Sequence, residues 1–292
     1  MALIMGIING RRLLWVGLLL ALWLLCSGTA RAADFPLSDR LQQFPQWSQK
    51  PPVQAATGDL VYPNGFLGTW RVTTTLRDLA APLAPDVVTP GFEGNRDYLG
   101  KPVTFEARFV RASTNQAQLV PLPIAPVQVL PLTRRIPPVV ADRAFNGLNL
   151  VKAYLDQSSE GAGDLVQQVK VDPDNPNRQV TLMKGDRARG RSPYRQLVTT
   201  ITGRATETPA PDTFITSEVF QQVFRGLPQP YLNAVESTTA YTCATDCAAA
   251  PETITADQAT AIYLSPQDPD FFKSGPQPVA LYRYEMVFER LS

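Results

Sequence analysis

The sequence contains no histidine among its 292 residues. Without an imidazole base, the chain cannot form a Ser-His-Asp or Cys-His catalytic site. Zinc, copper and non-haem iron sites that depend on histidine ligands are excluded in the same way. We therefore expect no metal, no cofactor and no catalytic residues, which predicts that the protein is not an enzyme. Chemistry based on carboxylate, tyrosine or lysine side chains stays open as an alternative.

An excess of positive charge is also lacking, since 27 lysines and arginines face 26 acidic residues. Residues 1–32 hold three arginines and no acid, so the remainder has 24 basic and 26 acidic residues. Domains that bind nucleic acid are usually strongly basic. We expect no nucleic-acid partner.

Cysteine is scarce, with three in the chain. Cys26 lies in the N-terminal segment, which leaves Cys243 and Cys247 in the rest of the chain. A redox pair is typically spaced C-x-x-C at a helix N-terminus, and neither feature is evident here. In an oxidising compartment, an isolated pair four positions apart predicts a local disulfide that closes a turn.

The N-terminus has the pattern of an export signal. Arg11 and Arg12 precede an apolar run of fourteen residues, 13–26. A transmembrane helix needs about 20 residues, and Ala30 and Ala32 fit the small positions before a cleavage site. We expect a signal peptide over 1–33 and an exported protein; an uncleaved anchor is the alternative. The paired arginines leave open the general secretory and twin-arginine routes.

Residues 34–64 are rich in proline, glutamine and serine and are expected to form an irregular extension. A β-barrel domain is expected over 65–292, where apolar and polar residues alternate with the period of a strand. In 140–155 the apolar residues recur at helical spacing, with Asp142 as N-cap. Arg143 is expected at the surface, and a buried Arg143 paired with an acid is the alternative. The expected fold is all-β and mainly antiparallel, with eight to ten strands in an up-and-down barrel or sandwich and one helix. The strands are expected at 66–76, 103–109, 165–171, 178–184, 195–206, 214–224, 231–242, 253–264 and 279–290. The segment 214–224 also fits a helix face, and its neighbours favour the strand.

The first of these strands contains Gly68-Thr69-Trp70 after an irregular arm. This resembles the Gly-x-Trp signature in the opening strand of lipocalin-like (calycin) β-barrel proteins. The resemblance implies that Trp70 plugs one end of the barrel and that an arginine of the last strand crosses its ring. Arg283 is the candidate for that arginine. The chain is longer than a typical lipocalin domain, and the helix at 140–155 departs from the family pattern.

The whole sequence also resembles a family of lumenal or periplasmic proteins of cyanobacteria and chloroplasts that has no established activity. The Leu67–Trp70 segment and Ala141–Gly147 carry this resemblance. It implies a location in the periplasm or the thylakoid lumen.

The last strand places Ala280, Tyr282, Tyr284, Met286 and Phe288 on one face. These side chains either fill the barrel core or line an apolar cavity, since a small barrel can do either. The candidate ligand-binding residues are Trp70, Tyr282, Arg283, Tyr284 and Met286.

Two groups of charged residues allow a functional interpretation. Lys184, Arg187, Arg189, Arg191 and Arg195 form a basic segment that could contact anionic lipid or a membrane complex, or could be a solvated loop. Glu218 and Glu236 lie in apolar strands and are candidates to face a cavity. Two carboxylates without a defined separation do not indicate a glycosidase.

Three functions remain. The first is a non-catalytic carrier of a small apolar ligand such as a lipid or pigment, which requires a cavity of at least about 300 Å³. The second is a structural or assembly factor that docks to a thylakoid or other membrane complex and has a packed barrel. The third is a cofactor-free enzyme that uses Glu, Tyr or Arg side chains in a cavity. The volume of the cavity distinguishes the carrier from the structural or assembly factor.

Overall fold

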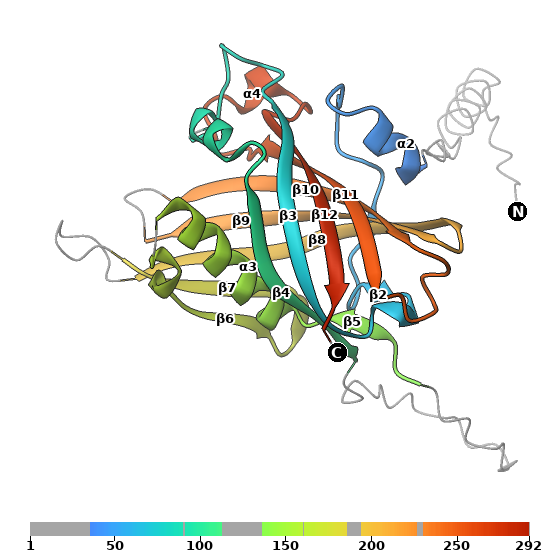
Figure 1. Ribbon diagram of the computed structural model, residues 1–292. Helices are drawn as coiled ribbons and strands as arrows, with labels where there is room; N and C mark the ends of the chain where they lie inside the picture. The colour runs from blue at the N-terminus through green and yellow to red at the C-terminus, as the bar shows by residue number, and fades with distance from the viewer. Residues whose placement is uncertain are drawn as a thin grey trace, which may run out of the picture. The chain divides into compact units, whose positions relative to one another are not determined.

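Twelve strands form one antiparallel sheet in the part of the chain that the computed structural model describes, residues 36–89, 91–112, 136–159, 161–185, 194–226 and 230–291 (Figure 1). The chain divides into two units, Met1–Phe35 and Pro36–Ser292. The expected signal peptide lies outside the described residues, as do Arg187, Arg189 and Arg191. In the described ranges, no helix has the length and apolar character needed to cross a membrane.

The elements follow one another in a simple order. The strands are β1 (Gln54–Ala55), β2 (Val61–Tyr62), β3 (Gly68–Ala80), β4 (Pro102–Arg111), β5 (Val139–Ala141), β6 (Val166–Asp172), β7 (Asn175–Lys184), β8 (Tyr194–Ala210), β9 (Thr213–Arg225), β10 (Tyr231–Cys243), β11 (Thr253–Leu264) and β12 (Ala280–Arg290). The helices are α2 (Leu37–Gln42), α3 (Arg143–Ser158) and α4 (Phe271–Ser274), with short 3₁₀ turns η1 (Asn64–Phe66), η2 (Glu93–Tyr98) and η4 (Ala162–Leu165).

The sheet is an open half-barrel. Its strand order is β2-β5-β4-β3-β12-β11-β10-β9-β8-β7-β6, with β1 paired to β8. From β6 to β12 each strand pairs with its successor, and β3 then pairs with β12. The expected all-β, mainly antiparallel class is therefore confirmed. The barrel is not closed, because β4 and β6 do not pair with each other.

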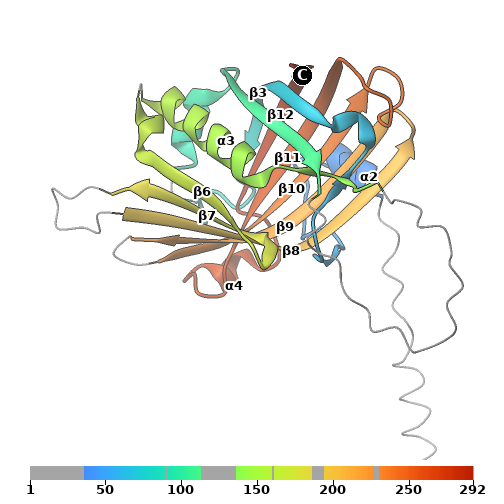
Figure 2. The same ribbon diagram turned by 90° about the horizontal axis from the view of Figure 1, so that it is seen from below.

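Helix α3 packs against both β4 and β6 and so covers the gap between them (Figure 2). The helix begins where it was expected, because the side chain of Asp142 accepts a hydrogen bond from the backbone N–H of Phe145. Asn146 bonds the free edge of β4: its Oδ1 accepts from the N–H of Arg108 and its Nδ2 donates to the carbonyl of the same residue. The helix thus satisfies backbone groups that an open sheet edge leaves unpaired.

The long strands follow from the alternation in the sequence. In β3, Trp70, Val72, Thr74 and Leu76 are buried on the concave face, and their neighbours are more exposed. The segment 214–224 is also a strand, as expected, and it extends over Thr213–Arg225. The sheet has more strands than expected because β1, β2 and β5 are two or three residues long. Alternation cannot be detected in so short a segment.

The N-terminal extension is not wholly irregular. Helix α2 forms over Leu37–Gln42, between Pro36 and Pro45, so these prolines bound the helix and do not interrupt it. Leu41, Phe44 and Trp47 of this arm are buried against the outer, convex face of β11 and β12. The arm therefore covers a part of the sheet that would otherwise expose apolar side chains.

Candidate functional site

A cavity of about 530 Å³ opens inside the half-barrel, where β3 ends and β12 begins. We call it the tyrosine cavity because Tyr98, Tyr154, Tyr231, Tyr282 and Tyr284 line it. The other lining residues are Leu76, Val103, Leu155, Phe224 and Ile262, which are apolar, and Thr74, Thr89, Asn95, Lys101, Gln157, Ser158, Asn233 and Thr260, which are polar.

A second cavity of about 520 Å³, which we call the inner cavity, lies further along the same strands. Its walls come from α3 and from ten strands, and they include Phe105, Leu150, Ile201, Phe220 and Met286. Thr74, Tyr154, Thr260 and Tyr284 line both cavities. The two cavities therefore adjoin, and these four side chains stand at the junction.

Four tyrosines of the tyrosine cavity have their hydroxyl groups held in the neutral form by burial. Burial disfavours a phenolate. It raises the pKa of these four, Tyr154, Tyr231, Tyr282 and Tyr284. The hydroxyl of Tyr282 also accepts a hydrogen bond from Asn95 Nδ2 at 3.0 Å. The wall thus offers hydroxyl groups and aromatic faces and no negative charge.

A charge cluster lies in the inner cavity. Glu218 of β9 accepts hydrogen bonds from Arg143 of α3 at 3.0 Å and from Arg204 of β8 at 2.9 Å. Arg204 also donates to Asn177, and Arg143 reaches Asp59 at 3.4 Å. Two arginines are balanced by two carboxylates, so the cluster is neutral as a whole. It ties α3 to the strands on the far side of the gap.

Arg143 was expected at the surface, but its side chain is only 17% exposed. The alternative, a largely buried Arg143 paired with an acid, is what the structure shows, with Glu218 and Asp59 as the acids. Arg204 and Glu218 stand directly opposite each other in the pairing of β8 with β9. Their oppositely charged, inward positions were the signal that sequence reasoning missed.

Tyr62 and Tyr241 close the inner cavity at the end away from the tyrosine cavity. Their hydroxyl groups share a hydrogen bond, and burial raises the pKa of Tyr62 well above the ordinary value and that of Tyr241 to about 12. Their rings pack against Phe66 and Phe109 in edge-to-face contacts. This aromatic cluster is the floor of the half-barrel.

The structure places three of the five expected ligand-binding residues at the cavities. Tyr282 lines the tyrosine cavity, Met286 lines the inner cavity, and Tyr284 lines both. Trp70 lines neither cavity and is fully buried in the floor, where its Nε1 donates to the carbonyl of Phe66. Its position agrees with a plug at one end of the sheet.

The expected contact between Arg283 and Trp70 is wrong. Arg283 points to the convex face and pairs with Asp257 of β11 at 2.6 Å. Arg290, near the end of β12, lies over the Trp70 ring with its guanidinium carbon 4.3 Å from the centroid. Residues on a strand alternate in direction, and the neighbours of Arg283 on either side, Tyr282 and Tyr284, face inward. Arg290 reaches Trp70 because the ring lies at the very end of the sheet.

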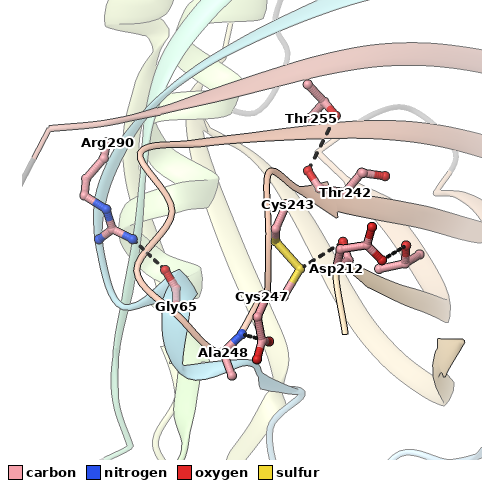
Figure 3. The surroundings of a disulfide bond; sticks show 10 residues. Gly65, Asp212, Thr242, Cys243, Cys247, Ala248, Thr255 and Arg290 are labelled. Carbon is pink, nitrogen blue, oxygen red and sulfur yellow. Dashed lines mark hydrogen bonds between the residues drawn. A yellow bond between two sulfur atoms is a disulfide. The ribbon is translucent and has the colours of Figure 1, made fainter. Parts of the chain in front are cut away.

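Cys243 and Cys247 form the expected disulfide (Figure 3). The bond closes the turn after β10, and the backbone of this turn lies against η1. Gly65 donates its N–H to the carbonyl of Cys247 and accepts from Arg290 at its own carbonyl. A side chain at Gly65 would overlap the carbonyl oxygens of Cys247 and Ala249. Gly65 thus contacts both the disulfide turn and Arg290, next to the aromatic cluster.

Glu236 does not face a cavity. It is fully buried on the convex face, where Arg40 of α2 donates to both of its carboxylate oxygens at 2.8 and 2.7 Å. The hydroxyl of Tyr263 donates to the same carboxylate. Glu236 is therefore the anchor of the N-terminal arm, whereas Glu218 is the carboxylate of the interior.

Comparison with known proteins adds one relationship. Residues 54–292 match the model of the family described as "Domain of unknown function (DUF6816)". The chain belongs to this family. The DUF6816 match begins at β1 and so includes all strands of the sheet and both cavities, whereas α2 precedes it. No curated protein and no solved structure matches the chain.

Proposed function

We propose that this protein is a non-catalytic carrier that binds a small apolar ligand, such as a lipid or pigment, inside the half-barrel. The observation that carries the proposal is the pair of adjoining cavities of about 530 and 520 Å³. Each lies in the range of about 300–1,000 Å³ that is typical of ligand pockets. A packed barrel, as a purely structural role requires, would have no such space.

The chemistry of the walls supports the same ligand class. Most small-molecule pockets are lined by apolar and aromatic side chains with a few polar groups that fix orientation. The tyrosine cavity follows this pattern, with Phe224, Ile262 and five tyrosines in its walls. Tyr282, Tyr284 and Met286 are the residues of β12 that we propose to contact the ligand.

The interior carboxylate does not favour an enzyme. A general acid or base needs to reach the substrate with its reacting oxygen. Glu218 accepts from Arg143 and Arg204, both at Oε1, so two arginines fix the position of the carboxylate. Its geometry is that of a carboxylate that holds two arginines in place, which supports a structural role within a binding protein.

The site of action that we propose is outside the cytoplasm, in the periplasm or the thylakoid lumen. The disulfide between Cys243 and Cys247 supports an oxidising compartment, where such bonds persist. We also propose a relationship to lipocalin-like barrels. The pairing of β3 with β12 and the arginine over Trp70 support it.

Titration with the neutral fluorescent probe aminoanthracene tests the proposal. The probe is expected to bind the protein with enhanced emission, and Thr260→Trp is expected to abolish binding, because Thr260 stands at the junction of the two cavities. Thr255→Trp is the matched control, since Thr255 lies on the same strand and is exposed. Absence of probe binding, or equal loss of binding in both variants, would contradict the proposal.

A further inference from the structure

Asn233 is a buried polar side chain whose hydrogen bonding is incomplete. It lies on β10, is 7% exposed and lines the tyrosine cavity. Among the buried side-chain polar atoms of the described residues, its Oδ1 is the one without a hydrogen-bond partner. A buried acceptor without a partner is costly, so each such atom in a folded protein calls for an explanation.

The surroundings of Asn233 define what could bind there. Tyr231, two positions earlier on β10, lines the same cavity. Phe224 and Ile262 of the neighbouring strands supply apolar surface. Because Oδ1 is an acceptor, the missing partner has to be a donor, such as a hydroxyl or an N–H group.

The same cavity disfavours a charged ligand. Of the described residues that line it, Lys101 alone carries a formal charge, and it is exposed to solvent. An ionised group next to Asn233 would lose its hydration without gaining an opposite charge. A carboxylate head group would also bring acceptors to an atom that needs a donor.

We propose that Asn233 Oδ1 accepts a hydrogen bond from a hydroxyl group of the ligand in the tyrosine cavity. The ligand class is an uncharged, apolar molecule that carries a hydroxyl group. This inference rests on the proposed carrier function and narrows it from apolar molecules in general to apolar alcohols.

A matched pair of ligands tests the inference. Decanol and decyl methyl ether share an alkyl chain, but only the alcohol can donate a hydrogen bond. In displacement of aminoanthracene, the wild-type protein is expected to bind decanol about tenfold more tightly than the ether, the ratio that one additional buried hydrogen bond gives. Equal affinities, or tighter binding of the ether, would overturn the inference without any variant being needed.

Substitution then identifies the acceptor. Asn233→Leu keeps a similar volume and is expected to bring the alcohol-to-ether ratio to about one, with ether binding retained as proof of a folded cavity. Thr260→Val, which removes a hydroxyl from the same wall, is expected to keep the wild-type ratio. A preference for the alcohol that persists in Asn233→Leu would overturn the assignment. If neither compound nor the probe binds the wild-type protein, the carrier function itself fails.

Discussion

Arg290 and Arg283 lie on the same strand but contribute very differently to stability. Arg290 donates to the carbonyl oxygens of Pro251, Leu67 and Gly65 and covers the ring of Trp70. It joins the segment just before β11, the residue just before β3, and η1. Arg283 makes one ion pair on the convex face, and both partners of that pair are more than a third exposed.

We predict that Arg290→Ala lowers the free energy of unfolding by about 2–4 kcal/mol, because three carbonyl groups lose a charged donor and the indole loses a cation–π contact. Arg283→Ala is expected to cost about 0–1 kcal/mol, as is usual for an exposed ion pair. Urea unfolding of the two variants measures the difference. Similar losses in both variants would show that Arg290 does not hold the floor together.

The buried tyrosines predict a loss of stability at alkaline pH. In the unfolded chain a tyrosine titrates at about pH 10, whereas burial raises the pKa of Tyr241 to about 12 in the folded protein. The folded state therefore holds a proton that the unfolded state has released. The contribution of Tyr241 to the free energy of unfolding is fully present below about pH 10 and is lost as the pH rises towards about 12.

The Tyr241→Phe variant has no hydroxyl to titrate at this position, so its stability is expected to fall less steeply over the same range. The difference should approach roughly 2–3 kcal/mol at the upper end. Urea midpoints measured across the range give the slope. Parallel slopes for the wild type and the variant would contradict the assignment.

At the scale of elements, the N-terminal end of α3 is bonded to strands on two sides of the half-barrel. Asn146 and Asp142 bind it to β4, and Arg143 binds it to Glu218 of β9. The helix has no fully buried residue, so polar contacts carry much of its attachment.

We predict that Glu218→Gln destabilises the protein by about 3 kcal/mol, because it leaves two largely buried arginines with Asp59 as their one remaining carboxylate among the described residues. Amide hydrogen exchange is expected to rise most in α3, which loses its bond across the gap. Glu285→Gln serves as the control, since Glu285 pairs with Arg77 on an exposed surface and should change stability little. Unchanged exchange in α3 would show that Arg143 does not fasten the helix.

The long strands and α3 were predictable because each shows its own period over ten or more residues. Asp142 was recognised as the cap of α3 for the same local reason. The opening between β4 and β6 was not predictable, because pairing between strands distant in the sequence leaves no local pattern. Helix α2 was missed because the proline-rich composition of 34–64 predicted an irregular extension, whereas the helix fits between Pro36 and Pro45.

The candidate site was predictable in part. The alternation of β12 placed Tyr282, Tyr284 and Met286 on the inner face, and these residues do line the cavities. The same alternation placed Arg283 on the outer face. The resemblance to Gly-x-Trp proteins nevertheless led to the expectation that Arg283 contacts Trp70. The presence of a cavity could not be predicted, because the same inward side chains can also fill a core.

At the scale of the whole molecule, the central claim is that the interior of the half-barrel binds an apolar ligand. Isoleucine provides reporters at suitable places: Ile262 lines the tyrosine cavity and Ile201 the inner cavity. Ile215 is buried but does not line either cavity, and it follows inward-facing Phe214 on β9, so it lies on the convex face. One labelled residue type thus samples both cavities and an internal control.

The most direct measurement is a methyl NMR titration of the isoleucine-labelled protein with aminoanthracene. Aromatic ring currents are expected to shift the methyl signal of Ile262, and that of Ile201 if the probe reaches the inner cavity, while Ile215 stays unchanged. Saturation with the probe that leaves both cavity signals in place, or that shifts Ile215 as much as Ile262, would contradict a ligand site inside the half-barrel.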